Sequence, residues 1–384
     1  MTPQGGSLRV VLAGGGSGGH ITPALAIYEG LQTRLGHNVD VLYVGTEHGL
    51  ERDLVPRAGV AFRTVHAGAL LRRGFGGKLR AVAETARGLV DAWRLLGQFR
   101  PRVVVGTGGY VSGPVGLAAV GRGIPLVLQE QNVWPGFTNR MLARRAHAIC
   151  VPFAEAVRYL PDGSRAIVSG NPVRPSLLAI SRDAARERLG VGADDVLLVA
   201  SGGSQGAPAI NNFLLRMWPA LAGQPHVHVR WATGPRRYDA VAARLPEAAG
   251  SGSRLQVLPY LYDMDWALKA ADVVVGRAGA NTCNEVLACG LAALLVPSPF
   301  VSEDHQTKNA AHLADAGAAV MVAEADLERD GPDVLQALLS DRGRREALCR
   351  AARGQFRPDA LDRIVEAVLA AAGRAGPGPE DSGP

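Results

Sequence analysis

Short apolar runs recur along this chain, and most of them are followed by glycines and then by a segment with helical periodicity. The alternation appears in both halves of the sequence. Strands that alternate with helices in this way are typical of an α/β fold with parallel sheets. Open sheets of this kind bind ligands at the carboxyl ends of their strands, so chemistry is expected in the loops that follow the apolar runs.

The runs expected to form strands in the first half are Leu8–Ala13, Val39–Val44, Val103–Gly106, Leu126–Gln129 and Ala148–Val151. Those in the second half are Val196–Ala200, Val227–Thr233, Leu255–Pro259, Val273–Val275, Ala292–Val296 and Ala318–Met321. Two such domains facing one another would form a cleft between their strand ends.

The length of 384 residues, with 47% hydrophobic and 20% charged residues, predicts two globular domains and excludes a disordered or fibrous chain. We expect domains at residues 1–170 and 171–350, because two prolines within Asn171–Pro175 interrupt helical continuity. Residues 351–372 are expected to contain a terminal amphipathic helix at Asp359–Ala372. The last residues, 373–384, are rich in Gly, Pro and acids, which predicts disorder.

The basic residues are concentrated in the first half of the chain. Residues 1–170 hold 19 Lys+Arg against 10 Asp+Glu, whereas residues 171–384 hold 22 against 25. Within residues 57–102 there are ten basic side chains and two acidic ones. This local excess indicates an anionic partner, which could be nucleic acid, phospholipid headgroups or a phosphorylated substrate.

We expect a soluble cytoplasmic protein. No signal peptide opens the chain, and the longest uncharged stretch, Val103–Gly121, contains six glycines and a proline and is therefore a poor membrane span. The four cysteines show no metal-type spacing, so we expect free thiols that pack in the interior.

The first glycine loop, Gly14–Gly19, leads through His20 toward a helix expected to begin near Thr22-Pro23. Glycines let the backbone approach a ligand closely, and a helix N-terminus attracts anions, so this loop is a candidate diphosphate cradle. His20 is a candidate general base because imidazole titrates near neutrality. The loop also matches the GxGxxG pattern of dehydrogenases, but such a fold has an acid directly after the second strand, whereas Val44 is followed by Gly45-Thr46, with Glu47 only third.

A second glycine loop, Gly106–Pro114, contains Gly108, Gly109 and Tyr110 and would give the same domain a second cradle, which suits a diphosphate-bearing substrate. The next strand leads to Gln129-Glu130-Gln131-Asn132 and then to Asn139. Amides donate and accept hydrogen bonds as sugar hydroxyls require. We expect the acceptor side of the site at Gly108, Gly109, Tyr110 and Asn139, with Glu130 as a second candidate base.

The second half repeats the arrangement. The loop Ser201–Ala207 opens a helix, and Gly276–Gly279 precedes a helix expected to begin near Asn281, whose free N–H groups suit a nucleotide diphosphate. Glu285 lies within that helix and could accept the hydroxyls of a ribose. Polar residues at Asp304-His305-Gln306 follow the later strand.

Seven motifs, GGGSGGH, GTGGYVSGP, EQN followed by TN, GNPVR, GGSQGA, GANTCNE and DHQTKNA, occur in the order found in the MurG family, and they span residues 14 to 310. The resemblance implies a GT-B fold, with two Rossmann-like domains around a cleft and a terminal helix packed on the first domain. It implies an inverting transfer of GlcNAc from UDP-GlcNAc to the C4 hydroxyl of MurNAc in undecaprenyl-diphosphoryl-MurNAc-pentapeptide (lipid I). That step belongs to peptidoglycan biosynthesis, and hence to cell shape and division.

The resemblance also assigns residues. It places the donor contacts at Ser17, Gly18, Gly19, Asn132, Arg174, Ser204, Gln205, Leu261, Gly279, Ala280, Asn281, Thr282, Glu285, His305 and Gln306. Three positions depart from the commoner family pattern: Ser17 replaces a usual Thr, Gln129 a frequent His, and Ala278 a frequent Ser. Ser17 retains the hydroxyl, and we assign no catalytic role to the other two.

No metal or other cofactor is expected. The only DxD, Asp263-Met264-Asp265, follows a loop that resembles a nucleotide contact. Helix dipoles, Arg174 and loop amides would stabilise the leaving UDP instead.

The acceptor implied by the resemblance is membrane-bound, so we expect peripheral attachment to the cytoplasmic face of the plasma membrane. Residues 68–80 mix four cations with apolar side chains and would contact anionic lipid. The stripe that continues from Leu79 to Leu96 is expected to face the core. Epimerases and lipid glycosyltransferases of the same fold are the nearest alternatives. A nucleic-acid-binding protein would explain the charge but not glycine loops in both domains, so no nucleic acid partner is expected.

Overall fold

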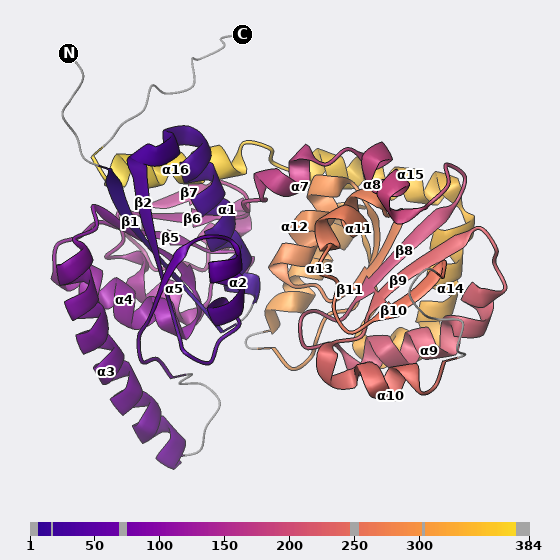
Figure 1. Cartoon of the computed structure of the whole chain (residues 1–384), viewed down its shortest axis with the longest axis horizontal. Helices are drawn as coiled ribbons and strands as arrows, with labels where there is room; N and C mark the ends of the chain where they lie inside the picture. The colour runs from indigo at the N-terminus through magenta and orange to yellow at the C-terminus, as the bar shows by residue number, and fades with distance from the viewer. Residues whose placement is uncertain (1–6, 17, 69–74, 246–252, 302–303, 374–384) are drawn as a thin grey trace, which may run out of the picture. The chain divides into compact units, whose positions relative to one another are not determined.

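The computed structural model describes residues 7–16, 18–68, 75–245, 253–301 and 304–373 (Figure 1). The chain divides into two compact units. The first contains residues 1–174 together with 357–384, and the second contains residues 175–356.

The first unit is built on a seven-stranded parallel sheet in the order β3-β2-β1-β4-β5-β6-β7. Its strands are β1 Leu8–Gly14, β2 Val39–Gly45, β3 Ala61–Thr64, β4 Val103–Gly108, β5 Leu126–Gln129, β6 Ala148–Val151 and β7 Ala166–Val168. From β1 the chain first builds outward through β2 to β3 and then resumes at β4 on the other side. The strand order therefore reverses between β1 and β4, which is where open sheets of this type bind ligands.

Helices cover both faces of this sheet (Figure 1). They are α1 Gly18–Leu35, α2 Glu51–Arg57, α3 Phe75–Phe99, α4 Gly109–Gly121, α5 Phe137–Ala143, α6 Ala154–Val157 and, from the end of the chain, α16 Ala360–Ala371. Ile364 and Val368 of α16 are fully buried and belong to the same core cluster as α1. A Cβ at Gly30 of α1 would lie 2.9 Å from Val365, so the missing side chain lets the two helices approach closely.

The second unit repeats the architecture with six parallel strands in the order β10-β9-β8-β11-β12-β13. They are β8 Val196–Ser201, β9 Val227–Ala232, β10 Leu255–Leu258, β11 Val273–Gly276, β12 Ala292–Leu295 and β13 Val320–Met321. Its helices are α7 Pro175–Ala179, α8 Arg182–Leu189, α9 Pro208–Ala222, α10 Tyr238–Ala242, α11 Met264–Ala270, α12 Ala280–Cys289, α13 His305–Asp315, α14 Leu327–Ser340 and α15 Arg342–Gln355. Here the order reverses between β8 and β11.

The prediction of an α/β fold with parallel sheets is confirmed, and every expected strand is present. Strands β3 and β7 have no counterpart in the expected set. Both are edge strands of three or four residues without a fully buried position, so they lack the apolar run that marks the inner strands. Near the end of the chain, residues 342–355 form α15 of the second unit, so the return to the first unit begins at Arg357 and not at residue 351. Residues 374–384 lie outside the described residues.

The prediction that the apolar stripe of α3 faces the core is only partly confirmed. Leu96 is buried, but Val90 and Trp93 are 48% and 43% exposed, and the guanidinium of Arg122 lies 4.4 Å from the centre of the Trp93 ring. Within the expected membrane segment, residues 69–74 lie outside the described residues. Among the helices that the structure describes, none combines the length and the hydropathy of a membrane span.

Candidate active site

The two glycine segments of the first unit meet at the point where its strand order reverses. One follows β1, and the other, expected as a loop at Gly106–Pro114, is the end of β4 and the start of α4. Gly108 and Gly109 have φ angles of +100° and +76°, which favour glycine. A Cβ at Gly108 would lie 2.8 Å from His20 Nδ1, and one at Gly109 would lie 2.3 Å from the carbonyl oxygen of Gly15. The junction of β4 and α4 therefore needs glycines to accommodate both the first loop and the His20 ring.

The hydrogen bonds of His20 determine which ring nitrogen carries the proton. Nδ1 lies 3.0 Å from the carbonyl oxygen of Thr107 and 3.2 Å from Oε1 of Gln131. Both partners are acceptors, so Nδ1 is the protonated nitrogen and Nε2 carries the lone pair. His20 lies in the first turn of α1, which begins at Gly18, one turn earlier than expected.

The amide of Gln131 is oriented by its own contacts. Its Nε2 donates to the carbonyl oxygens of Thr107 (2.7 Å) and Gln129 (3.0 Å) and to the side-chain oxygen of Gln129. The amide of Asn171 connects the same group, since it donates to the carbonyl oxygen of Gln131 at 2.8 Å and accepts from Gln129 at 3.1 Å. With its nitrogen surrounded by acceptors, Gln131 must present Oε1 to His20.

Glu130 is 1% exposed, and its carboxylate organises the loop between β5 and α5. Oε1 accepts hydrogen bonds from the backbone of Gln131 (2.9 Å) and from the backbone and side chain of Asn132 (2.9 and 3.0 Å). Oε2 accepts from the backbone of Gly136 (2.9 Å) and from Nδ2 of Asn139 (2.8 Å). Five N–H groups thus occupy the two oxygens, an arrangement suited to holding a loop.

Of the expected acceptor-side residues, Gly108 and Gly109 approach the His20 ring. Tyr110 lies beside the first loop, since a Cβ at Gly16 would be 2.6 Å from its ring. Asn139 is buried, and its Oδ1 has no hydrogen-bond partner in the part of the chain that the structure describes. Gly18 and Gly19 form the start of α1, whereas Ser17 lies outside the described residues.

Glu51 is a polar residue of this region that no sequence motif marks. It begins α2 and is fully buried, and its carboxylate accepts the N–H of Gly16 at 3.2 Å. Nearby, the hydroxyl of Tyr43 donates to the carbonyl oxygen of Gly14 at 3.0 Å. Burial and the negative charge of Glu51 raise the pKa of Tyr43 far above its usual range, which keeps this hydroxyl a donor.

In the second unit, the loops after β8 and β11 lie at the corresponding reversal of strand order. Ser204 and Gln205 are in the first of these loops. The second ends at Gly279, which precedes α12, and a Cβ at that position would meet no atom within 4 Å. The helix begins at Ala280, one residue before the expected start, so Asn281 and Thr282 lie in its first turn and Glu285 in its second. The N-terminus of α12 therefore has N–H groups and a positive dipole end next to an open backbone.

Other residues expected to contact the donor follow neighbouring strands. His305 and Gln306 begin α13, and Oε1 of Gln306 accepts the N–H of Ser298 at 2.9 Å. Nδ2 of Asn309 on the same helix donates to the carbonyl oxygen of Ala278 at 3.3 Å, which ties α13 to the loop before α12. Leu261 follows β10 and is buried. Arg174 is the last residue of the first unit before α7.

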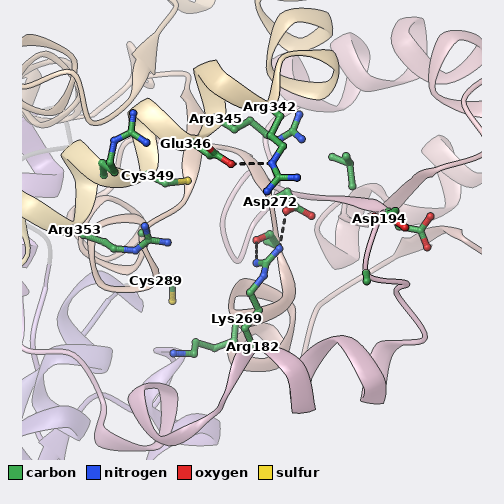
Figure 2. Close-up of a pocket in the computed structure, with 16 residues that line it drawn as sticks. Arg182, Asp194, Lys269, Asp272, Cys289, Arg342, Arg345, Glu346, Cys349 and Arg353 are labelled. Carbon is green, nitrogen blue, oxygen red and sulfur yellow. Dashed lines mark hydrogen bonds and ion pairs between the residues drawn. The ribbon is translucent and has the colours of Figure 1, made fainter.

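A cavity of about 690 Å³ lies in the second unit at the amino-terminal ends of strands β8 and β11 (Figure 2). This is the end of the sheet opposite the loops that follow the strands. Helices α11 and α12 end at this cavity. Arginines bind carbonyl oxygens at the end of α11: Arg182 donates to that of Ala271 at 2.6 Å, and Arg186 to that of Ala270 at 3.1 Å. Cations stabilise the negative end of a helix dipole. Since ligands bind at the carboxyl ends of such strands, the cavity belongs to the scaffold of the unit.

Of the Asp263–Asp265 carboxylate pair, which is not expected to bind a metal, Asp263 forms an ion pair with Arg230, whose guanidinium lies 3.1 Å from its Oδ2. No group of three His, Cys, Asp or Glu side chains with metal-ligand proximity occurs among the described residues. All four cysteines are free thiols. Burial raises the pKa of Cys150, Cys283 and Cys289 to about 12, so these thiols are poor nucleophiles.

Both units match family models. Residues 10–151 match the glycosyltransferase family 28 N-terminal domain, and residues 196–364 match the glycosyltransferase family 28 C-terminal domain. The chain is 43% identical to the UDP-N-acetylglucosamine–N-acetylmuramyl-(pentapeptide) pyrophosphoryl-undecaprenol N-acetylglucosamine transferase of Moorella thermoacetica, over 94% of this chain and 98% of that protein. It is 45% identical to the transferase of the same name from Salinibacter ruber, over 95% and 97% of the two chains.

Solved structures give the same result. The crystal structure of Acinetobacter baumannii MurG is similar with a TM-score of 0.71 and 31% identity, over 94% of this chain and 99% of that one. The UDP-GlcNAc 2-epimerase of Neisseria meningitidis is similar with a TM-score of 0.65, over 94% and 100% of the two chains, but at 14% identity this likeness shows a shared fold alone.

Proposed function

The chain belongs to glycosyltransferase family 28, within its MurG group of N-acetylglucosamine transferases, and from this membership we propose how its two units divide the reaction. It is a glycosyltransferase of peptidoglycan synthesis that moves GlcNAc from UDP-GlcNAc to the pyrophosphoryl-undecaprenol-linked MurNAc-pentapeptide. In our proposal the first unit binds the acceptor and supplies the base, and the second unit binds the nucleotide sugar.

His20 is the general base. Its Nε2 takes the proton of the C4 hydroxyl of MurNAc while that oxygen forms a bond to the anomeric carbon of GlcNAc. The bond from this carbon to the UDP oxygen breaks in the same step, UDP leaves with the electron pair, and the anomeric configuration inverts. The observation that carries this assignment is the pair of acceptors at Nδ1, the Thr107 carbonyl and Gln131 Oε1, which keeps the lone pair on Nε2.

The leaving UDP gains negative charge, and we assign its stabilisation to the loops of the second unit. The N-terminus of α12, with the open backbone at Gly279, offers N–H donors and a helix dipole for the diphosphate. Glu285 would accept the ribose hydroxyls, and Leu261, His305 and Gln306 would contact the remainder of the nucleotide sugar.

This charge stabilisation requires no metal ion. The pairing of Asp263 with Arg230 supports the proposal, because the only DxD carboxylate pair is then partly committed to a structural role. Transfer should therefore survive EDTA, and loss of activity in EDTA with recovery in Mg²⁺ would overturn this part of the proposal.

The acceptor carries a lipid, so we propose that the protein attaches peripherally to the cytoplasmic face of the plasma membrane. Ten basic and only two acidic side chains within residues 57–102 support an electrostatic contribution from anionic lipid. Residues 68–80 are the proposed contact.

The test is transfer of labelled GlcNAc from UDP-GlcNAc to a short-chain lipid I analogue. We expect the wild type to form the disaccharide product and His20→Ala to lower kcat by about 10²- to 10⁴-fold. The affinity for UDP-GlcNAc should change much less. A His20→Ala enzyme with normal turnover would remove this residue from the mechanism.

A further inference from the structure

The fully buried carboxylate of Glu51 lies next to the first glycine loop, and its hydrogen bonds join two loops. It accepts the N–H of Gly16 at 3.2 Å, in the loop after β1. It also accepts the N–H and the hydroxyl of Thr46, at 3.0 and 2.8 Å, in the loop after β2. No cation forms an ion pair with Glu51 among the described residues, so these donors are what compensates its burial.

Three glycines make room for this side chain. A Cβ at Gly15 would lie 2.5 Å from Glu51 Oε1, one at Gly45 would lie 2.4 Å from its Cγ, and one at Gly49 would lie 2.1 Å from its Oε2. None of the three has a positive φ, so their backbone conformations do not require glycine. Space for the Glu51 side chain is therefore a reason for glycine at all three positions, shared with Val111 at Gly15 and with Phe62 at Gly45.

Glu51 binds the segment from Gly14 to His20 near its middle, at Gly16. At the start of this segment, the hydroxyl of Tyr43 donates to the carbonyl oxygen of Gly14. At the end of this segment, the carbonyl oxygen of His20 accepts a hydrogen bond from the hydroxyl of Thr107 at 2.7 Å. Between these points Gly16 has φ +89°, and its N–H is bound by Glu51 and is thereby withdrawn from any phosphate.

We propose that Glu51 is a positioning residue for glycosyl transfer: by binding the N–H of Gly16 it sets the path of the loop that places His20 against the acceptor. The inference rests on the proposed role of His20. In nucleotide-binding folds an acid after the second strand binds a ribose. Here Glu51, at the start of the helix that follows β2, holds the neighbouring loop instead, and its carboxylate is occupied by the donors of two loops.

Glu51→Met tests this role, because methionine has a similar length and offers no comparable acceptor. Thr46→Val is the matched control, since it removes one hydrogen bond of the same carboxylate and leaves the bond to Gly16. We expect kcat to fall roughly 10- to 100-fold in Glu51→Met, as displacement of catalytic groups by about an ångström does. In Thr46→Val, kcat should stay within about twofold of wild type, and Glu51→Gln, which can still accept from one loop, should be intermediate.

Hydrogen exchange of the peptide covering residues 10–20 gives a readout that does not depend on activity. The amides of this peptide should exchange faster in Glu51→Met than in Thr46→Val at equal folded fraction. Wild-type exchange together with unchanged kcat in Glu51→Met would overturn the role of Glu51, as would equal losses in Thr46→Val. If the loop loosens as expected but wild-type enzyme transfers no GlcNAc, the failure lies in the proposed function and not in the positioning contact. If Glu51→Met does not fold, the same comparison is made between Glu51→Gln and Thr46→Val.

Discussion

Replacing Glu130 by Gln distinguishes a residue that holds a loop from one that removes a proton. The change keeps the shape of the side chain and converts one acceptor oxygen into an NH₂ group. Three N–H groups face Oε1 and two face Oε2. The best orientation therefore keeps the amide oxygen toward the three donors and turns the NH₂ toward Gly136 and Asn139. The partly buried N–H of Gly136 then loses its acceptor, and the buried Nδ2 of Asn139 keeps only the carbonyl oxygen of Gln129 at 3.3 Å.

The size of the effect follows from that count. A donor left without a partner costs about 1–3 kcal/mol, and only the Gly136 N–H is left so, which predicts a loss of about 1–3 kcal/mol of unfolding free energy. Proteins of ordinary stability have about 5–15 kcal/mol in total, so the loss is large enough to measure. A catalytic base predicts a different result, in which kcat falls by about 10²- to 10⁴-fold while stability is unchanged.

The assay is urea denaturation combined with hydrogen exchange of the peptide covering residues 130–140. Glu155→Gln, an exposed carboxylate in the same unit, is the control for the chemical change. We expect Glu130→Gln to unfold at lower urea than the control and to exchange faster within this peptide. If it unfolds together with the control while kcat falls a hundredfold or more, Glu130 is the base and the interpretation as a loop organiser is refuted.

Three further outcomes are expected. Gly108→Ala should lower kcat by roughly 100-fold, because its Cβ would lie 2.8 Å from His20 Nδ1; Gly123→Ala, also at positive φ but with no atom within 4 Å, should not, and equal losses would contradict the argument. Ellman's reagent at pH 8 should label Cys349 first, since burial raises the pKa of the other three thiols to about 12, and simultaneous reaction of all four would disagree. Sedimentation with anionic liposomes should exceed that with neutral ones and decrease with salt, whereas equal binding to both would exclude the electrostatic contribution.

Much of the fold could be predicted because its signals are local. Inner strands such as Val103–Gly106 are buried on both faces and therefore appear as continuous apolar runs. The edge strands Ala61–Thr64 and Ala166–Val168 are partly exposed and gave no such run. The N-terminus of the first helix was misplaced by one turn, because Pro23 is tolerated inside α1 and does not mark its start.

The sequence marks the glycine segments as the candidate site but does not distinguish the roles of the residues within it. His20 and Glu130 were both plausible bases from composition and position. Their partners differ in the structure: His20 Nδ1 faces two acceptors, whereas both oxygens of the Glu130 carboxylate accept N–H groups. Glu51 belongs to no glycine motif, so nothing in the sequence marked it as a partner of Gly16.

The sequence by itself determined that this chain forms parallel α/β units, that glycine loops follow their strands, and that it belongs among the family 28 glycosyltransferases. Those properties depend on residues near one another in the chain. Only the tertiary structure decided which nitrogen of His20 is basic, because the two acceptors of its Nδ1 lie 87 and 111 residues away. The order of strands around β1 brings the three residues together, and hydrogen bonds across such separations depend on that order and not on any single segment.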